Sequence, residues 1–369
     1  MIIKYKVGVE KYDILIKDKI DQSISTKINS INSDKKVLFV YDKKIDKKLI
    51  DQVIKILKET GCLLIALEFQ GNKKNKSEKS LLNLLDIMID NKFSKKSIVF
   101  SFGGGVLGDV AALAASLYYR GTIYFHIPST MTSIIDSCIG GKTAINYKNI
   151  INSIGNYYHP HSVFIFHDVI KLIPEREFIS GIPEIIKCGL IKKNNILDIL
   201  KNKKDEILQR NFRVISNLCA ETLKTKIFFF KNDVYEKKNR LILNFGHTFA
   251  HSIEMATEFL YKKEIYRHGE AVGLGILCEL YYSSGKKNKI FKDIENLLQE
   301  YDLPIKINMK SFKNKKQILL NNIYQYIFLD KKKISRYPRY ISMKKIYNPK
   351  IKELQNNDLI LETINNLIK

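Results

Sequence analysis

The chain has 369 residues, 45% of them hydrophobic, which allows two domains with cores of their own and excludes a wholly disordered protein. No apolar run approaches the roughly 20 residues of a membrane helix, and charges stand in the first residues where a signal peptide would be apolar. The net charge of +24 is spread along the whole chain and marks no single binding face, so no nucleic-acid partner is expected, and no membrane partner is expected either. Five scattered cysteines without a CxxC pair favour reduced thiols and a cytoplasmic protein.

The first half of the chain alternates short apolar runs with amphipathic segments. The pattern predicts strands at 36–42, 63–69, 97–102 and 122–127, and helices near 45–60, 80–91 and 109–119. Strands separated by helices imply a mostly parallel sheet with crossover helices. Residues 1–172 are therefore predicted to form an α/β nucleotide-binding domain.

The strand signal fades after about residue 172. Helical spacing predicts helices within 174–192, 194–231, 247–259, 268–285 and 289–302. Residues 173–369 are therefore predicted to form an all-α domain that binds metal and substrate. The last stretch, 334–369, has no pattern that indicates one kind of element.

A glycine-rich turn follows the strand predicted at 97–102. It places Gly103, Gly105 and Gly108 in the spacing that lets a backbone approach a pyrophosphate at a helix N-terminus. A tight strand-to-helix turn also favours glycine, so the pattern alone is weak. Asp42, at the end of an earlier strand, is placed to accept from a ribose hydroxyl, although in the usual fingerprint the acidic residue follows the glycines.

Residues 128–146 combine hydroxyls, glycines and charges in what the sequence predicts to be one loop. Gly140-Gly141-Lys142-Thr143 resembles the end of a P-loop, but Asp136 stands where its first glycine would be. A lysine beside an aspartate in a glycine-rich segment indicates binding of an anion or a polyol.

Histidines and a glutamate near three predicted helix starts indicate a metal site. His247 and His251 lie four residues apart on one helix face, but the glutamate of a zincin motif is missing. Glu184 and Lys187 begin one further helix, and His268 begins another. One carboxylate and two imidazoles would leave open positions on a zinc ion, as in a catalytic site. A lone histidine is more often structural, and spacing alone cannot show that these residues converge.

Eight spaced motifs together resemble 3-dehydroquinate synthase, a sugar-phosphate cyclase family, over about residues 36–335. They are Gly103–Asp109, Tyr119-Arg-Gly121, Pro128-Ser-Thr130, Asp136–Thr143, Asn152-x-Ile-Gly155, Pro183–Lys187, Arg240–His251 and His268–Ala271. The resemblance implies a cytoplasmic homodimer that uses NAD and a divalent metal, zinc or cobalt. It implies conversion of a heptulosonate 7-phosphate to 3-dehydroquinate and phosphate in the shikimate pathway.

The resemblance also implies a role for each residue that matches a family motif. Metal ligands are implied at Glu184, His247 and His268. Dinucleotide contacts are implied at Asp42, Gly103, Gly104, Gly105, Val106, Gly108, Asp109, Ser129, Thr130 and Lys142. Catalytic roles are implied at Asp136, Lys142, Lys187, Asn244 and His251. Substrate contacts are implied at Asn152, Lys226, Arg240, one of Lys331 and Lys332, and Arg120, which would reach the neighbouring subunit's phosphate pocket.

Two departures from the family pattern concern the cofactor. The stretch Gly71–Ser77 has lost an acidic residue that the family commonly has, and the register of its lysine is open. Ile151 stands where a lysine usually precedes Asn152. The alternatives are another cyclase of the inosose or valiolone synthase type, a metal-dependent polyol dehydrogenase, and a nucleic-acid-binding module, which would leave the glycines and histidines unexplained.

Overall fold

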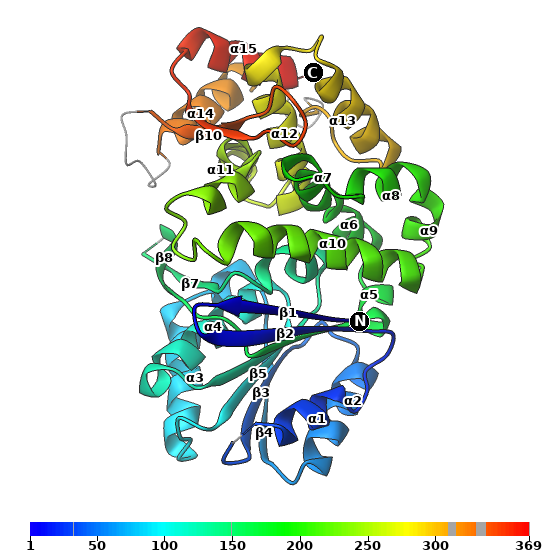
Figure 1. The fold of residues 1–369 in the computed structure, drawn as a ribbon. Coiled ribbons are helices and arrows are strands. Elements are labelled where there is room, and N and C mark those ends of the chain that lie inside the picture. Colours follow the sequence, from blue (N-terminus) through cyan, green and yellow to red (C-terminus); the bar gives the residue numbers. More distant parts are fainter. Residues whose placement is uncertain (32, 149, 309–314, 330–336, 369) are drawn as a thin grey trace. The chain divides into compact units, whose positions relative to one another are not determined.

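The computed structural model describes residues 1–368 except 32, 149, 309–314 and 330–336 (Figure 1). The chain divides into two compact units. Unit 1 comprises Met1–Pro174 and Arg210–Tyr235, and unit 2 comprises Glu175–Gln209 and Glu236–Lys369. In the part of the chain that the structure describes, no helix has both the length and the apolarity to cross a membrane.

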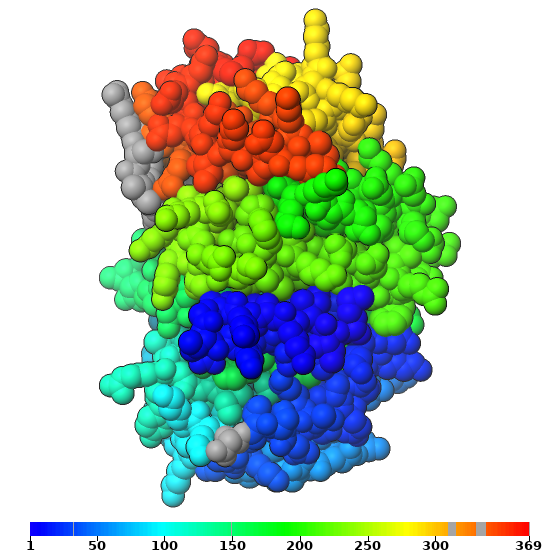
Figure 2. Space-filling view, in the orientation of Figure 1, coloured from blue at the N-terminus to red at the C-terminus, as the bar shows by residue number. Residues whose placement is uncertain are grey.

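A seven-stranded sheet forms the centre of unit 1. Its order is β1 (Ile2–Val7), β2 (Glu10–Lys17), β9 (Ser162–Phe166), β6 (Ile123–Pro128), β5 (Ile98–Gly103), β3 (Lys36–Asp42) and β4 (Leu63–Phe69). The β1–β2 pair is antiparallel and the other pairings are parallel. In Figure 2 the atoms of the β1–β2 pair (dark blue) form a continuous band on the face shown.

Helices cover both faces of this sheet, because successive side chains of a strand point to opposite faces. In β3, Val37 and Phe39 pack with α1 and α2, whereas Leu38 and Val40 pack with α3 and α4. These helices are α1 (Ser23–Asn29), α2 (Lys47–Glu59), α3 (Glu78–Asp90) and α4 (Gly105–Leu117). Strands that are buried on both faces read as continuous apolar runs, as the sequence of β3 does.

Further elements of unit 1 follow the sheet. They are the π-helical turn η3 (Ser133–Ser137), the hairpin β7 (Lys142–Tyr147) and β8 (Ile150–Tyr157), and the helices α5 (His167–Lys171) and α10 (Phe212–Phe230). Helix α10 contacts β1, β2 and η3. Residues 128–146 are thus not one loop as predicted, since they contain η3 and all but the last residue of β7.

Unit 2 is mainly helical. Its helices are α6 (Glu175–Ile179), α7 (Ile182–Ile191), α8 (Ile196–Asn202), α9 (Lys204–Leu208), α11 (His247–Tyr261), α12 (His268–Ser284), α13 (Lys289–Glu300), α14 (Lys316–Leu329) and α15 (Asn357–Leu367). Helix α12 contacts α7, α11, α13 and α15 and so forms the core of the unit. The 3-10 turn η4 (Asn239–Asn244) precedes α11.

The predicted fold class is confirmed, with a mostly parallel sheet in the N-terminal part and a helical C-terminal half. The prediction omitted one antiparallel hairpin of unit 2, formed by β10 (Arg339–Ser342) and β11 (Lys350–Glu353). These strands have four residues each and lie in the stretch whose pattern indicated no single kind of element.

Candidate functional site

The carboxyl ends of the parallel strands gather the predicted dinucleotide residues of unit 1. Asp42 ends β3, Gly103 ends β5, and Ser129 and Thr130 follow β6. From β3 the chain crosses to β4 on one side, whereas β5 lies on the other side of β3. Such a point, where the strand order reverses, is where open α/β sheets bind ligands.

The glycine-rich turn needs its glycines for space. Gly104 is the N-cap of α4 at an ordinary φ of −78°, but a Cβ there would lie 3.0 Å from the Thr130 side chain. A Cβ on Gly71, after β4, would lie 2.1 Å from a carboxylate oxygen of Asp42. The backbone of Gly71 therefore passes close to the Asp42 carboxylate, and Gly104 keeps the N-terminus of α4 free of a side chain, which leaves room for a pyrophosphate there.

Lys76 joins two of the predicted residues, although the sequence did not single it out. Its ammonium lies 2.5 Å from an Asp109 carboxylate oxygen and donates to Asn152 Oδ1 at 2.5 Å. Burial raises the pKa of Asp109, and the Lys76 charge opposes that shift. Lys76 lies within the altered stretch Gly71–Ser77, whose open lysine register was the signal that could have identified it.

Asp136 and Lys226 form a second charged pair in unit 1. The Lys226 ammonium donates to the Asp136 carbonyl at 2.5 Å and pairs with its carboxylate. Lys142, at the start of β7, lines a small cavity together with Gly105 and Asp109. The glycine turn and Lys142 are thus neighbours in unit 1.

The three predicted metal ligands converge in unit 2. Glu184 comes from the first turn of α7, His247 is the first residue of α11, and His268 is the first residue of α12. Their ligand atoms all lie within 4.8 Å of one another. Two glycines of α12 permit this packing, since a Cβ on Gly275 would lie 1.9 Å from the Gly246 carbonyl oxygen and one on Gly269 would lie 1.5 Å from that of Ser180.

The spacing of these atoms fits one ion. Glu184 Oε1 lies 3.4 Å from His247 Nε2 and 3.6 Å from His268 Nε2, longer than ordinary hydrogen bonds. Two ligand atoms about 2.1 Å from a tetrahedral zinc ion would lie roughly 3.4 Å apart. The three side chains therefore suit a divalent cation with at least one open coordination position.

Both imidazoles are oriented through their other nitrogen. His247 Nδ1 lies 3.2 Å from the Phe245 carbonyl oxygen, which can only accept, so Nδ1 carries the hydrogen and Nε2 keeps its lone pair. His268 Nδ1 lies 3.2 Å from Glu254 Oε2. Burial lowers the pKa of His268, but the carboxylates of Glu254 and Glu184 raise it more, so the net shift is upward. A second possible ligand group consists of His251, Glu254 and His268, and so has His268 in common with the first group.

Glu184 is held ionised inside the protein. Its residue is 1% exposed, as is Lys187, whose ammonium pairs with Glu184 Oε2. Burial raises the pKa of Glu184, but Lys187 and His268 lower it further, to about 2. An anionic oxygen is therefore available to a cation over the physiological pH range.

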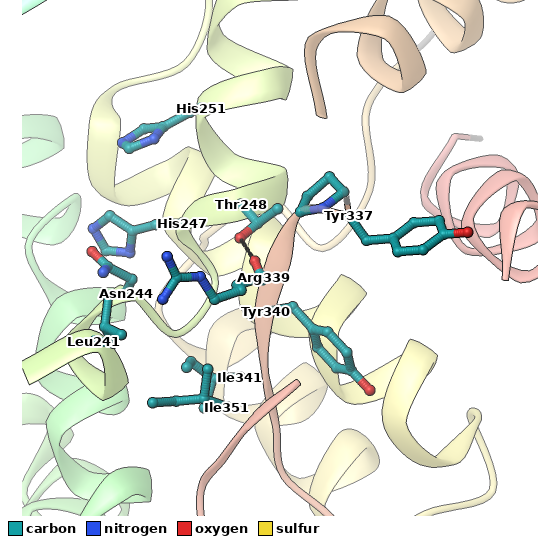
Figure 3. A pocket seen from close by; sticks show the side chains of 11 residues that line it. Leu241, Asn244, His247, Thr248, His251, Tyr337, Arg339, Tyr340, Ile341 and Ile351 are labelled. Atoms are coloured by element: carbon teal, nitrogen blue, oxygen red, sulfur yellow. Dashed lines mark hydrogen bonds between the residues drawn. The ribbon is translucent and has the colours of Figure 1, made fainter. Parts of the chain in front are cut away.

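A pocket opens beside the histidines (Figure 3). It is lined by Leu241, Asn244, His247, Thr248, His251, Tyr337, Pro338, Arg339, Tyr340, Ile341 and Ile351. Asn244 Nδ2 donates to Glu236 Oε1 at 2.7 Å, which orients the amide. Two predicted catalytic residues, Asn244 and His251, thus share one pocket with a candidate metal ligand, whereas Arg339 was not predicted.

The remaining predicted residues are Arg240, Arg120, Lys331 and Lys332. Arg240 is buried in η4, the turn that also carries Asn244. Arg120 is exposed in the 3-10 turn η2 (Tyr118–Arg120), at the far end of α4. The 13 residues of α4 put that end about 20 Å from the glycine turn at 1.5 Å per residue. Lys331 and Lys332 lie outside the described residues.

Comparisons with known protein families cover most of the chain. The model described as "3-dehydroquinate synthase N-terminal" matches residues 66–180, and the one described as "3-dehydroquinate synthase C-terminal" matches residues 181–333. The chain is 32% identical to a 3-dehydroquinate synthase of Legionella pneumophila (strain Paris), over 93% of this chain and 90% of that protein. It is 30% identical to one of Clostridium tetani, over 97% and 92%.

Solved structures of similar fold include two cyclases. A 2-deoxy-scyllo-inosose synthase, complexed with carbaglucose-6-phosphate, NAD+ and Co2+, superimposes with a TM-score of 0.85 and 21% identity over 100% of both chains. A 2-epi-5-epi-valiolone synthase from Streptomyces hygroscopicus subsp. jinggangensis 5008, with NAD+ and Zn2+ bound, superimposes with a TM-score of 0.83 and 20% identity over 98% of this chain and 99% of that one. At this identity the likeness shows the fold alone.

Proposed function

The chain belongs to the 3-dehydroquinate synthase family, and we propose that it converts 3-deoxy-D-arabino-heptulosonate 7-phosphate to 3-dehydroquinate and phosphate. The enzyme is a carbon–oxygen lyase of the shikimate pathway in this proposal. The observation that carries it is the convergence of Glu184, His247 and His268 beside a pocket lined by Asn244 and His251. Cytoplasmic location belongs to the same proposal and is supported by five free cysteines.

Two cofactors are part of the proposal. Bound NAD, held at the carboxyl edge by Asp42 and the turn Gly103–Asp109, would accept a hydride and return it within one turnover. A divalent cation held by Glu184, His247 and His268 would polarise a hydroxyl or carbonyl oxygen of the substrate. Because a proton on His268 competes with the cation, metal affinity should fall as the pH is lowered.

Side chains of this protein would transfer protons, neutralise charge and orient the substrate. His251, on the pocket wall, would move protons, since an imidazole exchanges them near neutral pH. The cationic side chains Lys187, Lys226 and Arg240 would neutralise the anionic groups of the substrate. Asn152 and Asn244 would orient it through hydrogen bonds, and Asp136 would hold Lys226 in place, as their ion pair already does.

A homodimer completes the proposal. Arg120 is exposed, far along α4 from the glycine turn of its own unit. Exposed apolar side chains lie near it in sequence, with Leu117 48% and Tyr119 63% exposed. A two-fold dimer would cover such side chains and let each Arg120 serve the partner's phosphate pocket.

The test is turnover with limiting NAD. The zinc-loaded protein is incubated with the heptulosonate phosphate and catalytic NAD, and phosphate, dehydroquinate and NADH are measured. We expect phosphate and dehydroquinate in equal amounts without net NADH. One NADH for each substrate consumed would instead identify a polyol dehydrogenase. In a parallel incubation with a hexose 6-phosphate, turnover of that substrate but not of the heptulosonate phosphate would identify a cyclase of the inosose synthase type.

A further inference from the structure

Arg339 occupies one wall of the pocket that holds His247 and His251. It is the first residue of β10, and Figure 3 shows its guanidinium directed toward Asn244 and His247. Its backbone carbonyl accepts a hydrogen bond from Thr248 Oγ1 at 2.7 Å. The strand that carries Arg339 is therefore fixed to the first turn of α11, next to a candidate metal ligand.

The Arg339 guanidinium has no hydrogen-bond or ion-pair partner among the described residues. Glu353 lies directly opposite Arg339 in the β10–β11 ladder, where an ion pair would be expected. The structure has no such pair, and Glu353 accepts instead from Gln355 Nε2 at 3.1 Å. Among the described residues, none receives a hydrogen bond or forms an ion pair with the Arg339 side chain. A guanidinium always carries its charge, so it can bind an anion at any physiological pH.

The chemistry of the pocket indicates which anion would bind. The fork of a guanidinium matches the oxygens of a phosphate in bidentate fashion. The five N–H donors of a guanidinium exceed what the two oxygens of a carboxylate need and suit the three terminal oxygens of a phosphoryl group. His251 lines the same pocket, whereas His247 Nδ1 and the Thr248 hydroxyl already donate to backbone carbonyls.

We propose that Arg339 binds the phosphoryl group of the substrate and is a specificity-determining residue of this pocket. The inference rests on the proposed function for the identity of the substrate, but phosphate binding itself does not require turnover. Strand β10 would then contribute directly to recognition of the substrate through its first residue, Arg339.

The test measures binding of inorganic phosphate to the zinc-loaded full chain by calorimetry. Arg339→Gln should weaken phosphate binding at least tenfold, because a charge-assisted bidentate contact is lost. Arg339→Lys should be intermediate, since it keeps the charge without the fork. Binding of 3-dehydroquinate, which has a carboxylate and no phosphate, should change less than twofold in both variants.

The matched control is Lys352→Gln. Lys352 is exposed on β11 of the same hairpin and does not line the pocket, so its replacement removes the same charge elsewhere. Unchanged circular dichroism and melting of Arg339→Gln would show that the hairpin folds. Phosphate affinity of Arg339→Gln within twofold of wild type, an equal loss in Lys352→Gln, or a loss confined to dehydroquinate would each overturn the assignment. Failure of turnover with intact, Arg339-dependent phosphate binding would overturn the proposed function alone.

Discussion

Replacing Glu184 by glutamine tests the electrostatics of the candidate metal centre without changing side-chain shape. The carboxylate pairs with Lys187, and both residues are 1% exposed. Glu184→Gln removes the negative charge and leaves the Lys187 ammonium buried without its counter-charge. We expect the variant to lose stability even in chelator-treated protein, and to bind zinc far more weakly.

The size of the stability loss follows from the pKa of Glu184. That pKa is about 2 in the folded protein against an ordinary 4.5. At 1.36 kcal/mol for each pKa unit, the difference corresponds to about 3 kcal/mol of stability. Breaking a buried pair from one side costs a similar 3–5 kcal/mol, as a rough general figure. Because the folded pKa is lowered, this stability is present above about pH 4.5 and is lost as the pH falls through about 2.

The assay is urea unfolding of chelator-treated protein at pH 7, followed by circular dichroism. Glu206→Gln is the control, because Glu206 forms an exposed pair with Lys203 at 3.2 Å, with the same spacing of three residues. An exposed pair contributes at most about 1 kcal/mol. A loss in Glu184→Gln no larger than that of the control would refute the reasoning. Repeated below pH 4.5, the measurement should give a smaller difference in unfolding free energy between Glu184→Gln and wild type, and an unchanged difference would also refute it.

Three further predictions concern positioning, pH and assembly. Glu254→Gln should weaken zinc binding about 10- to 100-fold in chelator competition, because it frees the His268 ring that Glu254 orients, and unchanged affinity would contradict that role. Burial raises the pKa of Glu279 from 4.5 to about 8, so folding takes up protons and stability falls as the pH rises through that window. The melting temperature of Glu279→Gln should therefore fall less than that of wild type between pH 5 and 8. An equal fall in both proteins would exclude ionisation of Glu279 as the cause. Mixing inactive Arg120→Ala and His251→Ala subunits should restore about a quarter of the active sites if Arg120 serves the partner, and verified exchange without activity would show that it does not.

The sequence by itself determined the repeating elements of the nucleotide-binding fold. The strands β3 and β4 occupy the predicted ranges 36–42 and 63–69. For β3 the reason is that a strand buried on both faces must be apolar throughout. Helices such as α2 and α13 were also predicted from the sequence, since side chains three and four residues apart share a face. The family motifs further indicated which residues belong to the site.

The two hairpins β7–β8 and β10–β11 were harder to predict, because their strands are short or exposed. Strand β8 is exposed along most of its length, so it lacks the alternation of buried and exposed side chains that identifies a strand. The sequence also contained no sign that β10 would place Arg339 beside His247, since nothing local links the two. Lys76 likewise meets Asp109 and Asn152 only through the folded chain.

Tertiary structure alone decided that Glu184, His247 and His268 meet. Each begins or nearly begins a different helix, and sequence spacing says nothing about the distance between helix starts. Their meeting depends on Gly269 and Gly275, where a single added Cβ would collide with a backbone carbonyl. Local sequence determines which side chains a helix presents, but the separation between helices is set by close packing of atoms from distant parts of the chain.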